Sequence, residues 1–312
     1  MARKPRLHVP GGLYHVMLRG NGGQDIFLDE EDHYHLYYLI QQGVEKYGHR
    51  IHGFCCMNNH IHLAIQVAED PLSDVMQNLS FRYTRWINKK SSRIGHLFQG
   101  RYKAILVDAN SYLLELVRYI HLNPVRAGIV TDPVDYAWSS HRCYLGMETL
   151  PWLETDWVLS QFAKRLKTCR KRYMDFVQAG KATGRLEEFH HGGEDRRVLG
   201  DDGFLKSVIE KPIRPSLDIT LEEIALHISA EYGVSEGELR SPTRNRKASE
   251  ARAVVGWLAR RLGVASIKEV AGYFQREAST LSRRVGRVDL EAKNSDELRG
   301  RLDRFINALT QA

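Results

Sequence analysis

The stretch HRIHGFCCMNNHIHLAIQV, residues 49 to 67, decides how the first part of the chain is interpreted. It consists of two mainly apolar runs separated by Asn58-Asn59, a dipeptide typical of tight turns. Residues 49–57 are therefore predicted to form one strand, and residues 60–67 its hairpin partner.

The second strand of this hairpin has two unlike faces. Because side chains alternate along a strand, its four aliphatic residues at 61, 63, 65 and 67 share one face, while His60 and His62 take the other. Two imidazoles at this spacing lie roughly 7 Å apart at their Cα atoms, close enough to bind one cation at about 2.1 Å. The alternative is a pair of half-exposed histidines that are hydrogen-bonded to their neighbours.

The flanking segments continue the pattern of strands and helices. Apolar spacing, capping residues and turn signals predict strands over 14–20 and 103–108 and helices over 29–48, 71–90 and 110–123. We therefore expect an α+β domain, an antiparallel sheet with helices packed against it.

The helix predicted over 110–123 carries a second candidate site. Its apolar stripe is expected to pack on the core, while Tyr119 and Asn123, four residues apart, lie on one side and border that stripe. Pro124 disfavours a helical Asn123 and so makes it the last helical residue. Alternatively, Tyr119 is a boundary aromatic with its hydroxyl in water, and Asn123 a cap.

Composition limits the class of protein. The chain has 312 residues, enough for two domains, and a formal charge of +7. No apolar run is long enough for a transmembrane helix, the basic N-terminus is not a signal peptide, and the four cysteines fit no zinc framework. These features favour a cytoplasmic protein without a membrane partner, and the basic excess suits a polyanion.

Three parts are expected along the chain. Residues 1–150 form the α+β domain, and residues 151–210 form a helical extension and linker, with 184–203 as an irregular connector. Residues 211–312 are predicted to form an all-helical domain.

Basic side chains mark candidate nucleic-acid surfaces in the first part. In residues 81–93, Phe81, Tyr83 and Trp86 alternate with basic residues, a pattern typical of proteins that bind unpaired strands. The alternative is an amphipathic helix with core aromatics and solvated charges. The candidate phosphate contacts are Arg82, Arg85, Lys89, Arg101 and Lys103.

The last part has a helix-turn-helix layout. SIKEVAGYF predicts a short helix, QRE a turn and STLSRRVGRV a second helix, whose first residues would meet a major groove. The block resembles the duplex-binding domain of the DnaA replication initiator, but REAST replaces that family's signature, so its sequence preference is not carried over. A helical protein-interaction domain is the alternative. The candidate DNA contacts are Arg246, Lys247, Ser279, Thr280, Arg283 and Arg284.

Four blocks in the first part occur in a familiar order. GGLYHVMLRGN, MNNHIHLAI, GHLFQGRYKAILVD and YIHLNPVRAGIV resemble the single-tyrosine HUH transposases, and among these the IS200-like, REP-associated tyrosine transposases. The resemblance covers residues 5 to 150 and implies a ferredoxin-like HUH fold. It implies that Tyr119 is the nucleophile and that His60, His62 and Asn123 are metal ligands, with Asn58-Asn59 replacing the Pro-Asn of many relatives.

The resemblance also implies an activity. Such an enzyme cuts and rejoins single-stranded DNA at hairpin-forming repeats through a 5′-phosphotyrosine intermediate, with Mg²⁺ or Mn²⁺ as cofactor. Neutral imidazole ligands favour Mn²⁺. Duplex DNA is the expected partner of the last domain, and both monomers and homodimers occur among relatives.

Two other functions are also consistent with the sequence. A non-catalytic, sequence-specific DNA-binding protein, a domesticated regulator, would bind DNA without cutting it. A metal-dependent hydrolase would use the histidines without the tyrosine and would never link DNA to protein. The acidic ligands common in two-metal nucleases are not apparent beside His60 or His62.

Overall fold

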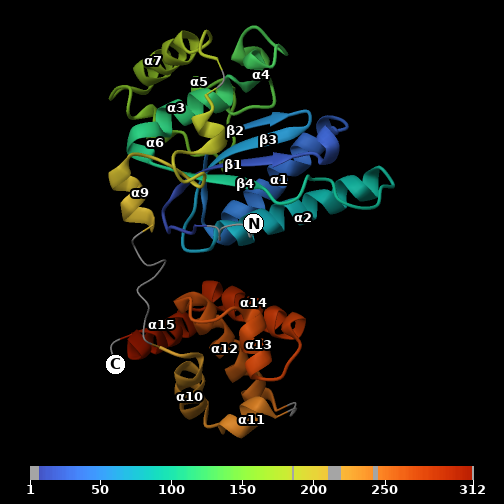
Figure 1. Ribbon diagram of the computed structural model, residues 1–312, viewed down its shortest axis with the longest axis vertical. Helices are drawn as coiled ribbons and strands as arrows, with labels where there is room; N and C mark the ends of the chain where they lie inside the picture. Colours follow the sequence, from blue (N-terminus) through green and yellow to red (C-terminus); the bar gives the residue numbers. More distant parts are fainter. Residues whose placement is uncertain (1–6, 185, 210–218, 242–244, 311–312) are drawn as a thin grey trace. The chain divides into compact units, whose positions relative to one another are not determined.

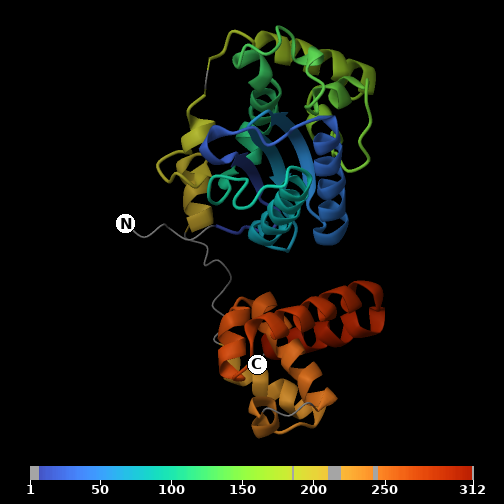
Figure 2. The ribbon, with the colours of Figure 1, turned by 90° about the vertical axis from the view of Figure 1, so that its right-hand side faces the viewer.

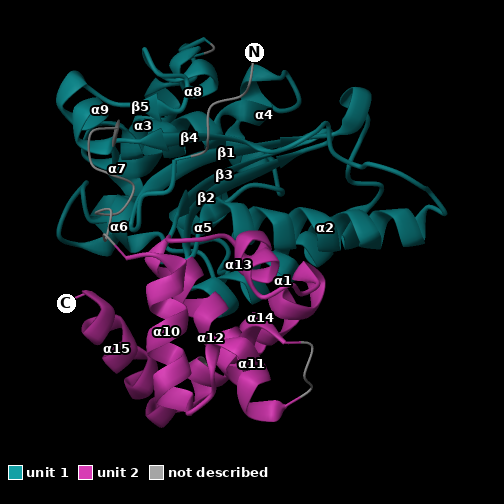
Figure 3. Cartoon of the chain, turned by 60° about the horizontal axis from the view of Figure 1, so that its bottom comes forward, with its two compact units in different colours: residues 1–213 teal, residues 214–312 magenta. Residues whose placement is uncertain are grey.

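The structure is a computed structural model that describes residues 7–184, 186–209, 219–241 and 245–310. It divides into two compact units, residues 1–213 and 214–312 (Figure 3). The boundary that the sequence predicts, between residues 210 and 211, lies outside the described residues.

A five-stranded sheet forms the centre of the first unit, with the order β2-β3-β1-β4-β5. The expected hairpin is present, since β2 and β3 pair antiparallel around the turn at Asn58-Asn59. β1 pairs antiparallel with β3 and with β4, whereas the short β5 is parallel to β4. The strands are β1 (Leu13–Arg19), β2 (Arg50–Met57), β3 (His60–Gln66), β4 (Lys103–Val107) and β5 (Val198–Leu199).

Helices cover both faces of this sheet (Figure 1). On one face lie α1 (Glu30–Tyr47) and α2 (Leu72–Lys90), and on the other α3 (Ala109–His121) and α7 (Leu166–Ala179). The sequence sets the ends of α1 locally: Asp29 and Asp32 form a capping box, and Gly48 ends the helix with a φ of 66°. The predicted α+β class, with an antiparallel core and packed helices, is confirmed.

The alternation along β3 sends its two sets of side chains into two different cores. Ile61, Leu63 and Ile65 pack with α1 and α2, as expected for the apolar face. Ala64 lies in the second core with α3 and α7. The histidine face is therefore covered as well, and its histidines sit at the edge of a packed layer.

The structure corrects the predicted end of the tyrosine helix. α3 ends at His121, and a separate short helix, α4 (Asn123–Arg126), follows. Asn123 is the first residue of α4 and not the last of α3, with Pro124 in its first turn. Proline suits a first turn because its missing N–H has no helical partner there.

The connector predicted over 184–203 is also corrected, since it contains regular structure. It contains α8 (Glu188–His191) and β5, and α9 (Asp202–Ile209) begins within its last two residues. Phe189 is fully buried and Val198 lies in the core, so this segment belongs to the first unit. Elements of two and four residues are too short to produce a hydrophobic period. The remaining short elements of the unit are η1 (Asn21–Gly23), η2 (Pro133–Asp135), α5 (His141–Leu145) and α6 (Asp156–Leu159).

The second unit is helical throughout its described residues, as the sequence predicts. Its core gathers around α12, and α14 and α15 pack side by side (Figure 2). The helix-turn-helix is formed by α13 and α14. The helices are α10 (Leu221–Tyr232), α11 (Glu236–Arg240), α12 (Arg246–Leu262), α13 (Ile267–Tyr273), α14 (Ala278–Asn294) and α15 (Asp296–Thr310). Within the described ranges, no helix has the length and apolar character needed to cross a membrane.

Candidate active site

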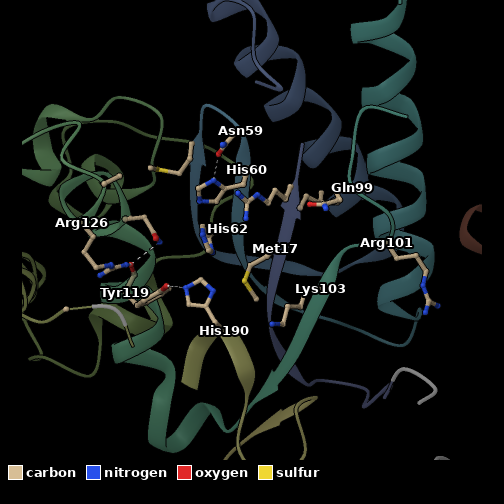
Figure 4. A pocket seen from close by; sticks show the side chains of 16 residues that line it. Met17, Asn59, His60, His62, Gln99, Arg101, Lys103, Tyr119, Arg126 and His190 are labelled. Atoms are coloured by element: carbon tan, nitrogen blue, oxygen red, sulfur yellow. Dashed lines mark hydrogen bonds between the residues drawn. The ribbon is translucent and has the colours of Figure 1, made fainter. Parts of the chain in front are cut away.

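A pocket of about 710 Å³ opens on the histidine face of the sheet, between β1, β3, β4, α3, α4 and α8. The four residues of the predicted site, His60, His62, Tyr119 and Asn123, all line it. Figure 4 shows the first three of them. The structure therefore brings together two stretches that lie more than fifty residues apart in the sequence.

The two imidazoles on β3 are neighbours, with ring centroids 4.9 Å apart. The ring of Tyr119 lies 6.2 Å from that of His62, measured between centroids. His62 is 2 % exposed, and His60 is half-buried. Burial lowers the pKa of His60 to about 4 and holds the pKa of His62 well below its usual value. Both rings are therefore neutral at pH 7, the form in which imidazole binds metals.

A third histidine, His15 on β1, fixes the tautomer of His62. Nδ1 of His15 lies 2.9 Å from the carbonyl oxygen of Phe189, which can only accept a hydrogen bond, so this nitrogen carries the proton. Nε2 of His15 is then an acceptor, because burial lowers the pKa of the ring to about 3 and keeps it neutral. This Nε2 lies 2.9 Å from Nδ1 of His62, which must donate. Nε2 of His62 is therefore the unprotonated nitrogen and carries a lone pair.

His60 is oriented in a similar way by its neighbour in the turn. Nδ1 of His60 lies 2.7 Å from Oδ1 of Asn59, an amide oxygen that accepts. The nitrogen of the same amide donates to the carbonyl oxygen of Gly23 at 3.1 Å, which supports this orientation of Asn59. The lone pair of His60 is thereby placed on Nε2. Hydrogen bonds that fix the tautomer in this way commonly support metal-binding histidines.

Tyr119 is more enclosed than the sequence predicts. It is 2 % exposed and lies in the second core, not at the border of the apolar stripe. The reason is α8, which returns over α3 and places Phe189 against the phenol ring with centroids 4.9 Å apart. The hydroxyl of Tyr119 contacts Nε2 of His190, the next residue of α8 (Figure 4).

The helix turn after Tyr119 supplies two more groups. The guanidinium of Arg126 lies 4.1 Å from the centre of the Tyr119 ring and donates to the Tyr119 carbonyl oxygen. The amide nitrogen of Asn123 donates to the carbonyl oxygens of Tyr119 and Ile120, at 3.1 and 3.2 Å. These two bonds use the nitrogen end of the carboxamide, so Oδ1 is the atom of Asn123 suited to a cation.

The set of donors fits a divalent cation with open positions. In the part of the chain that the structure describes, no cluster of three or more His, Cys, Asp and Glu side chains could hold a metal ion. A cation in this pocket would therefore depend on the amide oxygen of Asn123 beside the two imidazoles. Three neutral protein ligands leave coordination positions for phosphate and water.

The basic residues predicted to contact phosphate fall into two groups. Arg101 and Lys103 line the pocket, together with Arg19 of β1, which the sequence analysis did not single out. Arg82, Arg85 and Lys89 do not line it, since they lie on α2 at the other face of the sheet. There Arg82 donates to Gln42 of α1.

The aromatic residues predicted to stack on bases are also divided. Tyr83 is fully buried, and its hydroxyl donates to the carbonyl oxygen of Ile26 at 2.8 Å, so it is a core residue. Trp86 is half-buried and donates to Asp32 at 2.9 Å. Phe81 alone of the three is well exposed, at 61 %. The core alternative is therefore correct for Tyr83.

Besides Arg19, three further residues of this site were not predicted from the sequence. His15 could be recognised only from the pairing of β1 with β3, which places Met17 opposite His62 and His15 one pair further along the same face. His190 lies in the segment interpreted as a connector. Arg126 could have been found, because it follows Tyr119 by seven residues, two helical turns, in YIHLNPVR.

The candidate DNA-binding residues of the second unit lie at the surface. Ser279, Thr280, Arg283 and Arg284 are exposed in the first two turns of α14, and Arg246 and Lys247 at the start of α12. The buried Arg252 donates to the carbonyl oxygens of Glu238, Leu239 and Ser241, at 3.0, 2.7 and 3.2 Å. It thereby fixes the end of α11 against α12.

Comparison with known proteins finds a similarity in each of the two parts. Residues 8–123 match the family model described as "Transposase IS200 like", and residues 221–288 match that of the "Bacterial dnaA protein helix-turn-helix". A search of curated proteins found no match. One solved structure, titled "Structure of the REP associates tyrosine transposase bound to a REP hairpin", is 17 % identical and covers 49 % of this chain and 92 % of its own, with a TM-score of 0.42.

The matched residues coincide with the elements described above. The first match runs from the segment before β1 to the start of α4 and includes both β3 histidines, Tyr119 and Asn123. The second runs from α10 into α14 and includes the helix-turn-helix. The chain is thus similar to IS200-like transposases over residues 8–123 and to the helix-turn-helix of bacterial DnaA proteins over residues 221–288.

Proposed function

We propose that the first unit is a metal-assisted endonuclease and strand transferase that cuts and rejoins single-stranded DNA at hairpin-forming repeats, with Tyr119 as nucleophile. The observation that carries this proposal is the contact of the Tyr119 hydroxyl with His190, in a pocket that two neutral imidazoles also line. A phosphodiester held there would have a nucleophile on one side and a cation site on the other. A solved REP-associated tyrosine transposase is described as bound to a REP hairpin, which suggests the substrate class.

The reaction forms one bond and breaks one. The oxygen of Tyr119 attacks phosphorus, the bond to the 3′ oxygen of the preceding nucleotide breaks, and the products are a 5′-phosphotyrosine and a free 3′ hydroxyl. The proton of the phenol passes to Nε2 of His190, and the departing 3′ oxygen takes a proton from water. Because the phosphotyrosine retains the energy of the diester, a 3′ hydroxyl can attack it in the reverse sense and rejoin the strand.

The remaining side chains have supporting roles. His60, His62 and Asn123 would hold a divalent ion, which polarises the phosphate and offsets its charge when bound. Mn²⁺ suits imidazole ligands better than Mg²⁺ does, so we expect activity with both and tighter binding of Mn²⁺. The guanidinium of Arg126, over the ring of Tyr119, stabilises negative charge on the phenol oxygen. Arg101 and Lys103 contact flanking phosphates.

The second unit would bring the enzyme to duplex DNA. Its helix-turn-helix exposes two arginines and two hydroxyl side chains at the start of α14, the end that enters a major groove in proteins of this type. Arg246 and Lys247 add positive charge at the start of α12.

A covalent trapping experiment tests the proposal. The full chain is incubated with labelled hairpin oligonucleotides and Mn²⁺, and denaturing electrophoresis detects DNA linked to protein. We expect an adduct with the native chain and none with Tyr119→Phe, while the two bind the DNA with similar affinity. DNA binding without any adduct would contradict the enzyme and favour a non-catalytic DNA-binding protein. Cleavage that releases free ends and survives in Tyr119→Phe would favour a hydrolase.

A further inference from the structure

A second groove of about 460 Å³ lies next to the candidate active site, between α2 and the loop that precedes β4. It is adjacent to the pocket of Tyr119, and Leu18 and Arg101 line both. Figure 4 shows Arg101 on the side of the pocket away from Tyr119, pointing outward. We propose that this groove holds an unpaired base of the DNA strand whose backbone crosses the active site.

The groove combines apolar side chains with polar groups. Its apolar lining includes Leu97, Phe98 and Phe81, of which Phe81 is 61 % exposed although the other two are buried. The side chains of Gln77, Thr84 and His96 supply hydrogen-bonding groups around this surface. A nucleobase has the same two properties, because its faces are apolar and its edges carry donors and acceptors.

The apolar lining of the groove is held in place by backbone hydrogen bonds to β1 and η1. The amide of Gln99 donates to the carbonyl oxygen of Arg19, and the amide of Asn21 donates to that of Leu97, both at 2.8 Å. Phe98 stacks on the buried ring of Tyr83 with centroids 6.2 Å apart. A surface fixed in this way can bind a base without first being ordered, which reduces the entropic cost of binding.

The charges around the groove favour a nucleic acid over an apolar ligand. Arg101 stands where the groove meets the active site, and the guanidinium of Arg85 lies 5.8 Å from the centre of the Phe81 ring. A DNA strand that leaves the active site past Arg101 would place a base against Phe81 and a phosphate near Arg85. The alternation of aromatic and basic residues in 81–93 thus has a binding role at Phe81 and Arg85, although Tyr83 is structural.

The test combines protein variants with abasic DNA. It rests on the proposed function only for its substrate, a DNA hairpin with unpaired flanks. The protein is the full chain carrying Tyr119→Phe, so that the DNA is not cut. Single abasic sites are placed at successive flanking positions, and affinity is measured by fluorescence anisotropy with and without Phe81→Ala. Tyr38→Ala is the matched control, because Tyr38 is an exposed aromatic of α1, 52 % exposed.

We expect one flanking position at which the abasic site weakens binding by roughly 5- to 150-fold, the range for loss of one stacked base. That loss should nearly disappear in Phe81→Ala and persist in Tyr38→Ala. If every abasic position has the same effect with and without Phe81, or if Phe81→Ala binds as tightly as its parent, the groove holds no base. If the effect of one abasic position depends on Phe81 but the native chain forms no adduct, the result supports the base-binding groove and contradicts only strand cleavage.

Discussion

Nε2 of His15 accepts a hydrogen bond from Nδ1 of His62 over 2.9 Å, and this contact determines which nitrogen of His62 faces the pocket. His15 is itself fixed by the carbonyl oxygen of Phe189, so a residue of α8 orients a candidate metal ligand on β3 through a histidine of β1.

Replacing His15 should therefore weaken metal binding without touching a proposed ligand. In His15→Phe, Nδ1 of His62 loses its acceptor, and we expect a roughly 10- to 100-fold rise in the Mn²⁺ concentration that gives half-maximal adduct. His15→Gln keeps a donor and an acceptor and should stay closer to the native value. An unchanged Mn²⁺ dependence in His15→Phe, with normal thermal unfolding, would show that this contact does not tune the site.

His190 should contribute to the chemical step. Because it contacts the Tyr119 hydroxyl, His190→Ala removes the proposed proton acceptor, and we expect single-turnover adduct formation to slow by about 100-fold or more. His191→Ala is the control, since His191 is the adjacent residue, is 57 % exposed at its side chain and pairs with Glu187. Faster adduct formation in His190→Ala would mean that α8 obstructs the nucleophile instead of assisting it.

The first unit should lose stability in mild acid. Burial lowers the pKa values of His33, His49 and His141 to about 4, from 6.5 in the unfolded chain. Between pH 6.5 and 4 the unfolded chain therefore binds more protons, and the free energy of unfolding falls as pH falls, by up to about 1.4 kcal/mol per pH unit for each histidine. Urea denaturation at pH 7 and pH 5.5 measures this.

His49→Gln provides the control for this pH dependence. The pKa of His49 is lowered by burial alone, so its replacement should reduce the slope of stability against pH without removing a charge partner. An unchanged slope would mean that His49 is hydrated in the folded protein.

The second unit should account for duplex binding. Arg283→Ala combined with Arg284→Ala removes two charges from the exposed start of α14, and we expect weaker duplex binding with a salt slope smaller by about 2. Arg304→Ala removes one charge from the exposed surface of α15 and should have little effect. Adduct formation on single-stranded hairpins should be normal in both variants. Equal effects of the two variants would place the duplex elsewhere.

The strands and long helices could be predicted from the sequence because their signals are local. The turn at Asn58-Asn59 and the acidic first turn of α1 each act within a few residues, and the structure confirms the hairpin and the helix. The proximity of Tyr119 to His62 was expected from a resemblance in the order of motifs, not from any local pattern.

Contacts made between distant segments could not be predicted. His15 depends on the register between two strands, and His190 depends on α8, a four-residue helix with no period of its own. Tyr83 and Phe81 belong to the same aromatic pattern in the sequence. Tyr83 is a core residue because it contacts Ile26 and Phe98, whereas Phe81 is exposed.

The central claim is that Tyr119 itself becomes linked to DNA, and peptide mass spectrometry tests this most directly. After the reaction and nuclease digestion, trypsin cuts after Arg118 and Arg126, so the nucleophile lies at the start of YIHLNPVR. The account predicts that this peptide carries one added nucleotide as a phosphodiester on Tyr119. A nucleotide on another tyrosine, or a covalent adduct in which residues 119–126 stay unmodified, would contradict it.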